Sequence, residues 1–436
     1  MAWFTISYAF GQNQDTVAFN NVNVIPMTEE MVFPNKRVII ANGKIIMVEP
    51  ASKPIQYEVS TTIDGTGKYL MPGFSEMHFH LRTDDIESNL KLLIANGITT
   101  VRNMAEMPEQ DQIAIRDKLL SNGTPVPNYF TTGPYLQSAD LQTEEQAIEV
   151  VQMHKRRGYD FVKIADNLPE NIYLKLLEEG QKNNIPIIGH AQRKLPLEYS
   201  LRMKSIEHIE EFLYVSEKTQ NNLLFDYDLA DLHEVGQKIK QSGIYVGTTM
   251  AIFDFINACL NDDRFAQLQT HEWTKYLART EREGFLTEKN DYRKMKNKKF
   301  GGVEASTLFH QYFVWMQKFS RIFVDNQVPL LICSDTYGMV IPGFSLHQEF
   351  RFLQDAGIKP YDILLASIVN PARYLHIYST EGTIAKGKNA NLVLLDKNPL
   401  EDIENKTSIE GVMVKGHYYD RSQLNKMLRE VEEAFR

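Results

Sequence analysis

The stretch PGFSEMHFH, at residues 72–80, is the part of the sequence that decides the fold. Its apolar run predicts a strand that ends in two histidines, His78 and His80, at positions i and i+2. Because side chains alternate between the two faces of a strand, both imidazoles point to the same side. In the first strand of a closed barrel that side is the interior, where two neutral imidazoles can hold a first-row metal ion. A His-x-His pair is weak evidence alone, so the hypothesis depends on the segments that follow.

Short apolar runs alternate with helical patterns between about residues 71 and 377. The runs cover residues 73–81, 99–104, 128–133, 161–165, 186–191, 205–211, 245–250 and 330–335. Strands that alternate with helices indicate βα units and a parallel sheet, and eight strands is the number that closes a barrel. One intervening helix has clear ends, because Thr143 and Gln146 form a capping-box pattern and Gly158 follows the helical stretch. We therefore predict an α/β fold, a (β/α)8 TIM barrel.

Both ends of the chain are rich in strand patterns. Residues 37–48 (RVIIANGKIIMV) predict a hairpin with an Asn-Gly turn, and residues 390–396 and 411–416 are strand-like runs. We predict a small β-sandwich domain built from residues 1–70 and 378–436, with a terminal helix, around a barrel of residues 71–377.

A segment at about residues 251–327 is too long for a simple connection between strand and helix. We predict that it is an insertion over the mouth of the barrel. It contains the basic run RKMKNKK, at residues 293–299, whose ordinary explanation is a solvated helix face or loop.

Composition excludes several classes of function. The chain of 436 residues has 47 Lys and Arg against 56 Asp and Glu, a net charge of −9, which argues against a nucleic-acid partner. No run of 18 or more apolar residues occurs, so we expect no membrane-spanning segment. The two cysteines, Cys259 and Cys333, cannot form a disulfide framework or a four-cysteine zinc site.

The compartment and the oligomeric state stay open. Residues 1–12 (MAWFTISYAFGQ) are similar to the tail of a secretory signal but lack its basic region, and an ordinary N-terminal strand explains them as well. Cytoplasmic and periplasmic or secreted locations are both compatible with this start, and so is a homo-oligomer.

Further ligand-type residues end other predicted strands: Lys163 ends the fourth, His190 the fifth, His208 the sixth and Asp335 the eighth. Each has an ordinary explanation, because either histidine could be a hydrogen-bonded core residue and Asp335 could cap a helix. However, the carboxyl ends of barrel strands are where barrel enzymes place their active sites. Six such residues at these ends therefore favour one common site.

Lys163 lies in the run FVKIA, at residues 161–165, where alternation turns its side chain into the barrel. Burial disfavours an isolated ammonium, and a neutral amine can react with carbon dioxide to form a carbamate. The two carbamate oxygens can bridge two metal ions. The alternatives are that Lys163 reaches solvent or pairs with Asp166.

Taken together, the chain resembles the amidohydrolase superfamily, and within it the binuclear metal peptidases and imidazolonepropionase-like amide hydrolases. The segments that carry the resemblance are PG at 72–73, the two following histidines, TTVR at 99–102, FVKI at 161–164, GHA at 189–191, IEH at 206–208, SD at 334–335 and GTIAKGKNANLV at 382–393. Glu76, Asn103 and Ile209 depart from the family's usual Asp, Asp and Gly. No substrate-binding residue is carried over.

The resemblance implies two divalent metal ions, with zinc favoured by four imidazoles, a carbamate and a carboxylate. The first ion would be held by His78, His80 and Asp335 and the second by His190 and His208, with N6-carboxylated Lys163 as the bridge.

The expected function is hydrolysis of an amide C–N bond in a dipeptide or cyclic amide, in which a metal-activated hydroxide attacks the carbonyl. Asp335 would be the catalytic residue that takes the proton and passes it to the leaving nitrogen. The alternatives are a deaminase or phosphoester hydrolase of the same superfamily, or a barrel that binds a metal or small molecule without turnover.

Overall fold

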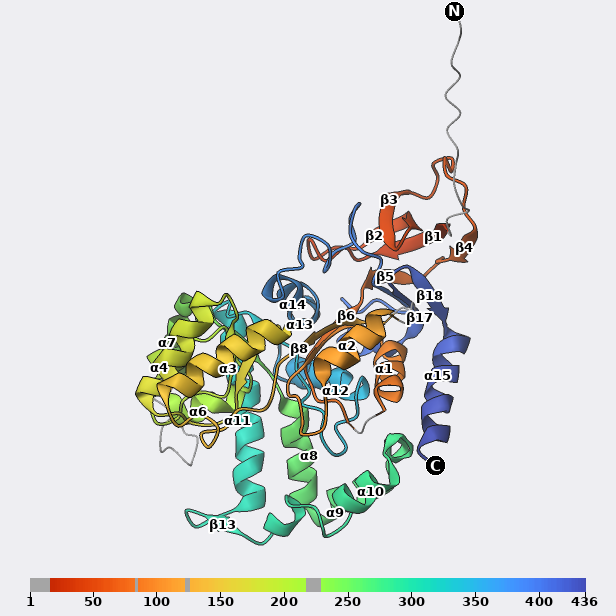
Figure 1. Ribbon diagram of the computed structural model, residues 1–436. Coiled ribbons are helices and arrows are strands. Elements are labelled where there is room, and N and C mark those ends of the chain that lie inside the picture. The colour runs from red at the N-terminus through yellow and green to blue at the C-terminus, as the bar shows by residue number, and fades with distance from the viewer. Residues whose placement is uncertain (1–15, 83–84, 122–125, 217–228) are drawn as a thin grey trace, which may run out of the picture.

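The computed structural model describes residues 16–82, 85–121, 126–216 and 229–436. The signal-like start at residues 1–12 lies outside these residues. Figure 1 shows a body of strands and helices with a sheet at one end and a lobe of helices at the other.

Parallel strands at the centre of the body follow one another in chain order. They are β6 (Phe74–Phe79), β7 (Ile98–Asn103), β8 (Asn128–Thr131), β9 (Val162–Ile164), β10 (Ile187–Gly189), β11 (Ser205–Ile206), β12 (Tyr245–Gly247) and β15 (Leu330–Leu331). They pair in the orders β6-β7-β8 and β9-β10-β11-β12-β15. A parallel bridge between Thr132 and Phe161 links β8 to β9, and Met77 N donates to Ile332 O (3.1 Å) between β6 and β15. This circular order is the one expected of the predicted barrel.

Every predicted run overlaps one of these strands, and all the strands except β7 are shorter than predicted. After β11 the chain turns into a 3-10 helix, η1 (Ile209–Glu211), within the run 205–211. After β12, Thr249 has a left-handed backbone (φ 54°) that ends the extended conformation, and Met250 begins a helix.

Helices surround the strands. They include α1 (Ile86–Ala95), α2 (Gln112–Ser121), α3 (Glu144–Arg157), α4 (Glu170–Lys182), α5 (Leu197–Ser200), α6 (Phe212–Val215), α7 (Leu229–Ser242), α12 (Phe344–Asp355), α13 (Pro360–Ser367) and α14 (Val369–Tyr374). The capping box predicted for α3 is confirmed, with Thr143 and Gln146 bonded reciprocally and Gly158 in the left-handed conformation at its end. Among the described residues, no helix is long and apolar enough to cross a membrane.

Apolar side chains fill the ring of strands at its amino-terminal end. Met77, Ile188 and Leu331 are fully buried in one cluster with Tyr374. The hydroxyl group of Tyr374 lies 2.7 Å from Ser205 Oγ, at the first residue of β11, so this cluster fills the amino-terminal end of the strands. The polar side chains of the ring lie at its carboxyl-terminal end.

Strands from both chain ends form one mixed sheet. Its members are β1 (Thr16–Val24), β2 (Phe33–Ala41), β3 (Lys44–Pro50), β4 (Thr61–Asp64), β5 (Tyr69–Pro72), β16 (Leu392–Leu395), β17 (Ile409–Val414) and β18 (His417–Asp420). The predicted Asn42-Gly43 hairpin is present, with positive φ at both residues. The strands pair continuously rather than as the two separate sheets of a predicted sandwich, because irregular β1 pairs with β4 along one part and β5 along another.

The last helix of the chain is α15 (Arg421–Ala434). An Asp420 capping box begins it, and Leu424 and Val431 are its buried apolar side chains. It packs against α1 and β17, so the last residues of the chain contact the body of the molecule.

The lobe at the other end comes from the predicted insertion. It contains α8 (Met250–Leu260), α9 (Asp262–Gln269), η2 (Glu272–Tyr276), α10 (Arg279–Phe285), η3 (Arg293–Met295), β13 (Lys299–Phe300), β14 (Val303–Glu304) and α11 (Ala305–Asp325) (Figure 1). A 3-10 helix, η4 (Ile403–Thr407), lies outside this lobe.

The basic run of the insertion, residues 293–299, is not wholly solvated. Arg293 is buried, pairs with Asp262 and Glu288, and donates to Cys259 O.

Candidate metal centre

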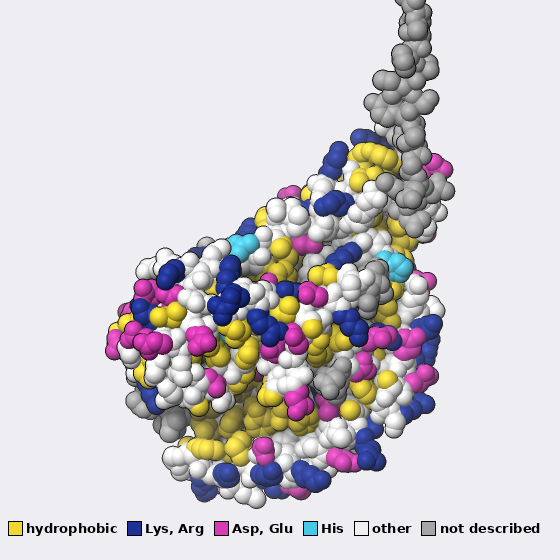
Figure 2. All heavy atoms as spheres, viewed as in Figure 1, with side chains coloured by type: hydrophobic (Ala, Val, Ile, Leu, Met, Phe, Trp, Pro, Cys, Tyr) yellow, Lys and Arg dark blue, Asp and Glu magenta, His cyan; other side chains and the backbone are white. Residues whose placement is uncertain are grey.

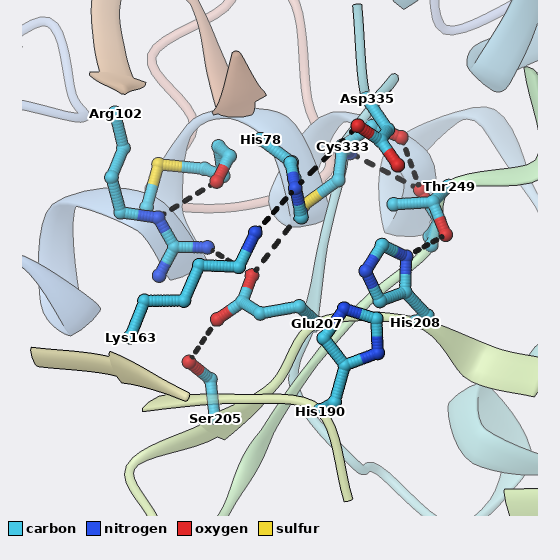
Figure 3. A network of polar contacts seen from close by, with 12 residues as sticks. His78, Arg102, Lys163, His190, Ser205, Glu207, His208, Thr249, Cys333 and Asp335 are labelled. Carbon is cyan, nitrogen blue, oxygen red and sulfur yellow. Dashed lines mark hydrogen bonds and ion pairs between the residues drawn. The ribbon is translucent and has the colours of Figure 1, made fainter. Parts of the chain in front are cut away.

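The six ligand-type residues predicted from the sequence lie at one end of the strand ring. His78, His80 and Asp335 offer ligand atoms that all lie within 4.8 Å of one another. Figure 3 shows His78, Lys163, His190, His208 and Asp335 converging from different strands. The structure thus brings the predicted residues together, whereas their role as metal ligands stays a prediction.

His80 and Asp335 approach His78 closely. The Nε2 atoms of His78 and His80 are 3.2 Å apart, and Asp335 Oδ1 lies 3.2 Å from His80 Nε2 and 3.7 Å from His78 Nε2. Asp335 N donates to His78 O (2.9 Å), and its backbone is left-handed (φ 59°). A non-glycine residue pays for this conformation, and such strain clusters at functional sites.

His190 and His208 form the other side of the site. Their ring centroids are 4.6 Å apart, and the His208 ring lies 4.9 Å from that of His78. His190 Nδ1 is bonded to Glu211 Oε1 (2.7 Å) and His208 Nδ1 to Thr249 Oγ1 (2.9 Å). Each ring therefore keeps Nε2 for a ligand, the arrangement in which metal-binding histidines are usually held.

Lys163 is buried within the same cluster. Its Nζ lies 3.1 Å from His78 Nε2 and 5.4 Å from the centre of the Tyr135 ring. Burial lowers the pKa of Lys163 to about 8, although Asp335 and Glu207 oppose the shift. The alternative partner, Asp166, instead accepts a hydrogen bond from Ser138 Oγ (2.6 Å). A readily deprotonated amine among imidazoles is what carbamate formation requires.

The donor set fits a divalent transition metal. Imidazole nitrogens, an amine and a carboxylate converge in a partly buried space, with Nε2 of His78 facing His80, Lys163 and Asp335. Burial holds the pKa values of His78 and His208 well below the ordinary value, so both rings are neutral, the form that binds metals. Imidazole with carboxylate is a ligand set suited to zinc and its neighbours.

A cavity of about 760 Å³ opens beside the centre. His80 and Asp335 line its inner end, and the insertion contributes Ile252, Glu281 and Phe285 to its wall. A volume of this size suits a small-molecule ligand.

Solved structures share this fold across nearly the whole chain. Bottromycin amidohydrolase has a TM-score of 0.74 at 18% identity, covering 96% of this chain and 90% of that one. A Xaa-Pro dipeptidase with bound methionine has a TM-score of 0.67 at 15% identity, covering 93% and 100%. In sequence, residues 319–418 match the amidohydrolase family. The family match is limited to this segment, whereas the shared fold extends over nearly the whole chain.

Curated relatives match over shorter segments of the sequence. An adenine deaminase from Chelativorans sp. (strain BNC1) is 23% identical over 203 residues, which is 42% of this chain. The match spans 33% of that relative's length.

Sequence reasoning missed the buried residues that hold the predicted ligands in place. Glu207 Oε2 lies 3.7 Å from His78 Nδ1 and 2.5 Å from Arg102 Nη2, and Glu207 Oε1 accepts from Ser205 Oγ (2.5 Å). Arg102 also donates to Tyr374 (2.7 Å) and to Met77 O (2.7 Å). Figure 3 shows Glu207 between Arg102 and His78. A buried carboxylate here can orient the His78 ring.

Thr249 and Glu211, the partners of His208 and His190, were also missed. Both had a signal in the sequence, because Thr248-Thr249 ends the seventh strand as the ligands end theirs, and Glu210-Glu211 interrupts an apolar run after His208.

The departure at Glu76 has a structural explanation within the superfamily fold. Glu76 is fully buried and accepts hydrogen bonds from Ser334 Oγ (2.5 Å), Ser334 N (3.0 Å) and His78 N (3.0 Å). Burial raises the pKa of Glu76 to about 7. Its carboxyl group joins β6 to the loop before Asp335 and thereby fixes the spacing of the two sides of the site.

Proposed function

We propose that this protein is a metal-dependent hydrolase that cleaves the C–N bond of an amide, in a dipeptide or a cyclic amide. The observation that carries the proposal is the cluster of His78, His80 and Asp335, of which His80 and Asp335 line the 760 Å³ cavity. Barrel enzymes place catalytic residues at this end of their strands, and the similarity to an amidohydrolase and a dipeptidase supports amide chemistry.

The same six side chains would hold two divalent ions, zinc by preference. His78, His80 and Asp335 would hold the first ion and His190 and His208 the second, and carboxylated Lys163 would serve both. When bound, such ions lower the pKa of a water molecule and polarise a substrate carbonyl.

Asp335 is the general base and acid of the proposed reaction. Its Oδ1 faces His78 of β6 and His80 just after it, and its neighbour Thr336 fixes the end of β6 by donating to His80 O (2.8 Å). The carboxylate lines the cavity, so it can take a proton from the attacking water and return it to the leaving nitrogen.

Other residues of the chain position the site. Glu211 and Thr249 fix the rings of His190 and His208 through their Nδ1 atoms, and Glu207 lies against Nδ1 of His78. Preorganised ligands need no rearrangement when charge develops, which is how such a site lowers a barrier.

The test is hydrolysis by zinc-loaded protein of a panel that contains dipeptides, N-acyl amino acid amides, five- and six-membered cyclic amides, a phosphodiester and aminopurines. Protein treated with EDTA is the control. Metal-dependent cleavage of an amide supports the proposal. Ammonia release from an aminopurine without amide cleavage would instead identify a deaminase, the second candidate, which the match to an adenine deaminase favours. Bound metal without turnover of any substrate would contradict both.

A further inference from the structure

We propose that the cavity selects amides whose leaving group is apolar and uncharged. We propose further that Glu281 sets this preference by neutralising the charge of Arg82. The inference rests on the proposed amide hydrolysis and adds its substrate class. It assigns to the insertion, which supplies Glu281, the role of a specificity element.

Arg82 and Glu281 meet at the cavity wall. Arg82 follows the metal-site strand β6, whereas Glu281 lies on α10 of the insertion. Arg82 Nη2 and Nε both donate to Glu281 Oε1, at 2.8 and 3.0 Å. The two side chains are 8% and 14% exposed, so water screens the pair weakly. Glu281 thus occupies the Nε–Nη2 edge of the guanidinium and neutralises its charge, and Nη1 donates to Val340 O (3.5 Å), so Arg82 is a weak partner for a substrate carboxylate.

Arg82 is the one Lys or Arg among the cavity-lining residues that the structure describes. The lining also contains the carboxyl groups of Glu106, Glu109 and Asp335. Glu106 Oε2 already accepts from Tyr159 OH (2.6 Å) and Gln112 N (2.8 Å). A carboxylate on the substrate would therefore lose water without gaining an unpaired cation from this wall, which is costly.

The rest of the wall offers apolar contact. Phe285, Tyr292 and Tyr337 line the cavity, with the Phe285 and Tyr337 rings in edge contact at 4.7 Å between centroids. Met107 and Ile252 line it too. Figure 2 shows hydrophobic side chains gathered in the hollow between the body and the insertion lobe. Such a wall favours aromatic or aliphatic groups.

The experiment compares two substrates that differ only in charge at the end of the leaving group. Glycyl-phenylalaninamide is neutral there, and glycyl-phenylalanine carries a carboxylate. The ratio of their kcat/KM values is measured for zinc-loaded wild type, Glu281→Gln and the control Glu283→Gln. Glu283 is on the same helix but pairs with Arg279 at the surface, with 55% of its side chain exposed.

We expect wild type and Glu283→Gln to prefer the amide. Glu281→Gln should release Arg82 and move the ratio toward the carboxylate by roughly tenfold or more, the value of one charge-assisted hydrogen bond. Adding Arg82→Gln to Glu281→Gln should abolish that gain, which a merely structural role of the pair would not do. Equal ratios in Glu281→Gln and Glu283→Gln, or a wild type that prefers the carboxylate, would overturn the inference.

Calorimetric binding of N-acetyl-phenylalaninamide and N-acetyl-phenylalanine to the same zinc-loaded variants separates this inference from the proposed function. If no amide is cleaved, the proposed function fails. The inferred preference for an uncharged group is then tested by binding alone. Glu281→Gln should strengthen binding of N-acetyl-phenylalanine relative to N-acetyl-phenylalaninamide, and an unchanged ratio of the two affinities refutes the inference.

Discussion

Glu207→Gln tests the buried ion pair beneath the candidate metal centre. Glu207 and Arg102 have no exposed side-chain surface, and they meet at 2.5 Å. The substitution keeps the shape of the side chain and an oxygen that can accept from Arg102 or Ser205. It removes the charge, so Arg102 is left as an uncompensated buried cation.

Breaking a buried ion pair on one side costs about 3–5 kcal/mol, and the retained acceptor places this variant near about 3 kcal/mol. The unfolding entropy of a chain of 436 residues converts that into a fall in Tm of about 3 °C. Because Glu207 Oε2 lies 3.7 Å from His78 Nδ1, metal affinity should fall by roughly 10- to 100-fold as well.

The assay is thermal unfolding of metal-free protein, followed by zinc titration against a competing chelator. The control is Glu178→Gln, because Glu178 is 62% exposed and pairs with Lys175 at the surface. We expect the control to stay within about 0.5 °C of wild type. If Glu207→Gln behaves like the control in both measurements, the buried network neither stabilises the barrel nor orients His78.

Three more outcomes follow from the structure. Asp335→Asn should lower activity by roughly 10²-fold or more while His190 and His208 still bind metal, as metal analysis with kinetics would show; near-full activity would remove Asp335 as the base. Lys163→Ala should lose metal and activity together and regain part of both with formate or propionate, and no rescue with metal retained would exclude a carbamate bridge. Burial lowers the pKa of His154 to about 4 in the folded chain, so the ring is neutral there. In the unfolded chain the pKa of this ring is about 6.5. The contribution of neutral His154 to the free energy of unfolding is complete above about pH 6.5. It falls as the pH drops toward about 4, and about 2 kcal/mol of it is lost at about pH 5. His154→Gln should therefore lose less stability than wild type on acidification; equal losses would contradict this.

The positions of strands and predicted ligands could be derived from the sequence because each depends on local patterns. Strand alternation turned Lys163 inward, and the structure has it buried beside His78. Capping chemistry set the ends of α3, and the Asn-Gly turn set the β2–β3 hairpin. The insertion was visible as excess length between two predicted strands.

The rest depends on contacts between residues far apart in the chain, which no local pattern specifies. Arg102 reaches Glu207, 105 positions away, and Arg82 reaches Glu281, 199 positions away. Arg293 is buried because the lobe folds back on Asp262, whereas the run of charges around it is typical of solvent. The sandwich prediction did not anticipate that β5 would pair with both β16 and the irregular β1 and so join the strands of both chain ends in one sheet.

The number of metal ions per chain tests the central claim most directly. Purified protein, supplemented with zinc and bicarbonate and freed of loose metal, is analysed by inductively coupled plasma mass spectrometry against its amino-acid content. The account predicts about two zinc ions per chain, because four imidazoles, a carboxylate and a carbamylated lysine exceed what one tetrahedral ion takes. One ion or none in fully supplemented protein would contradict it.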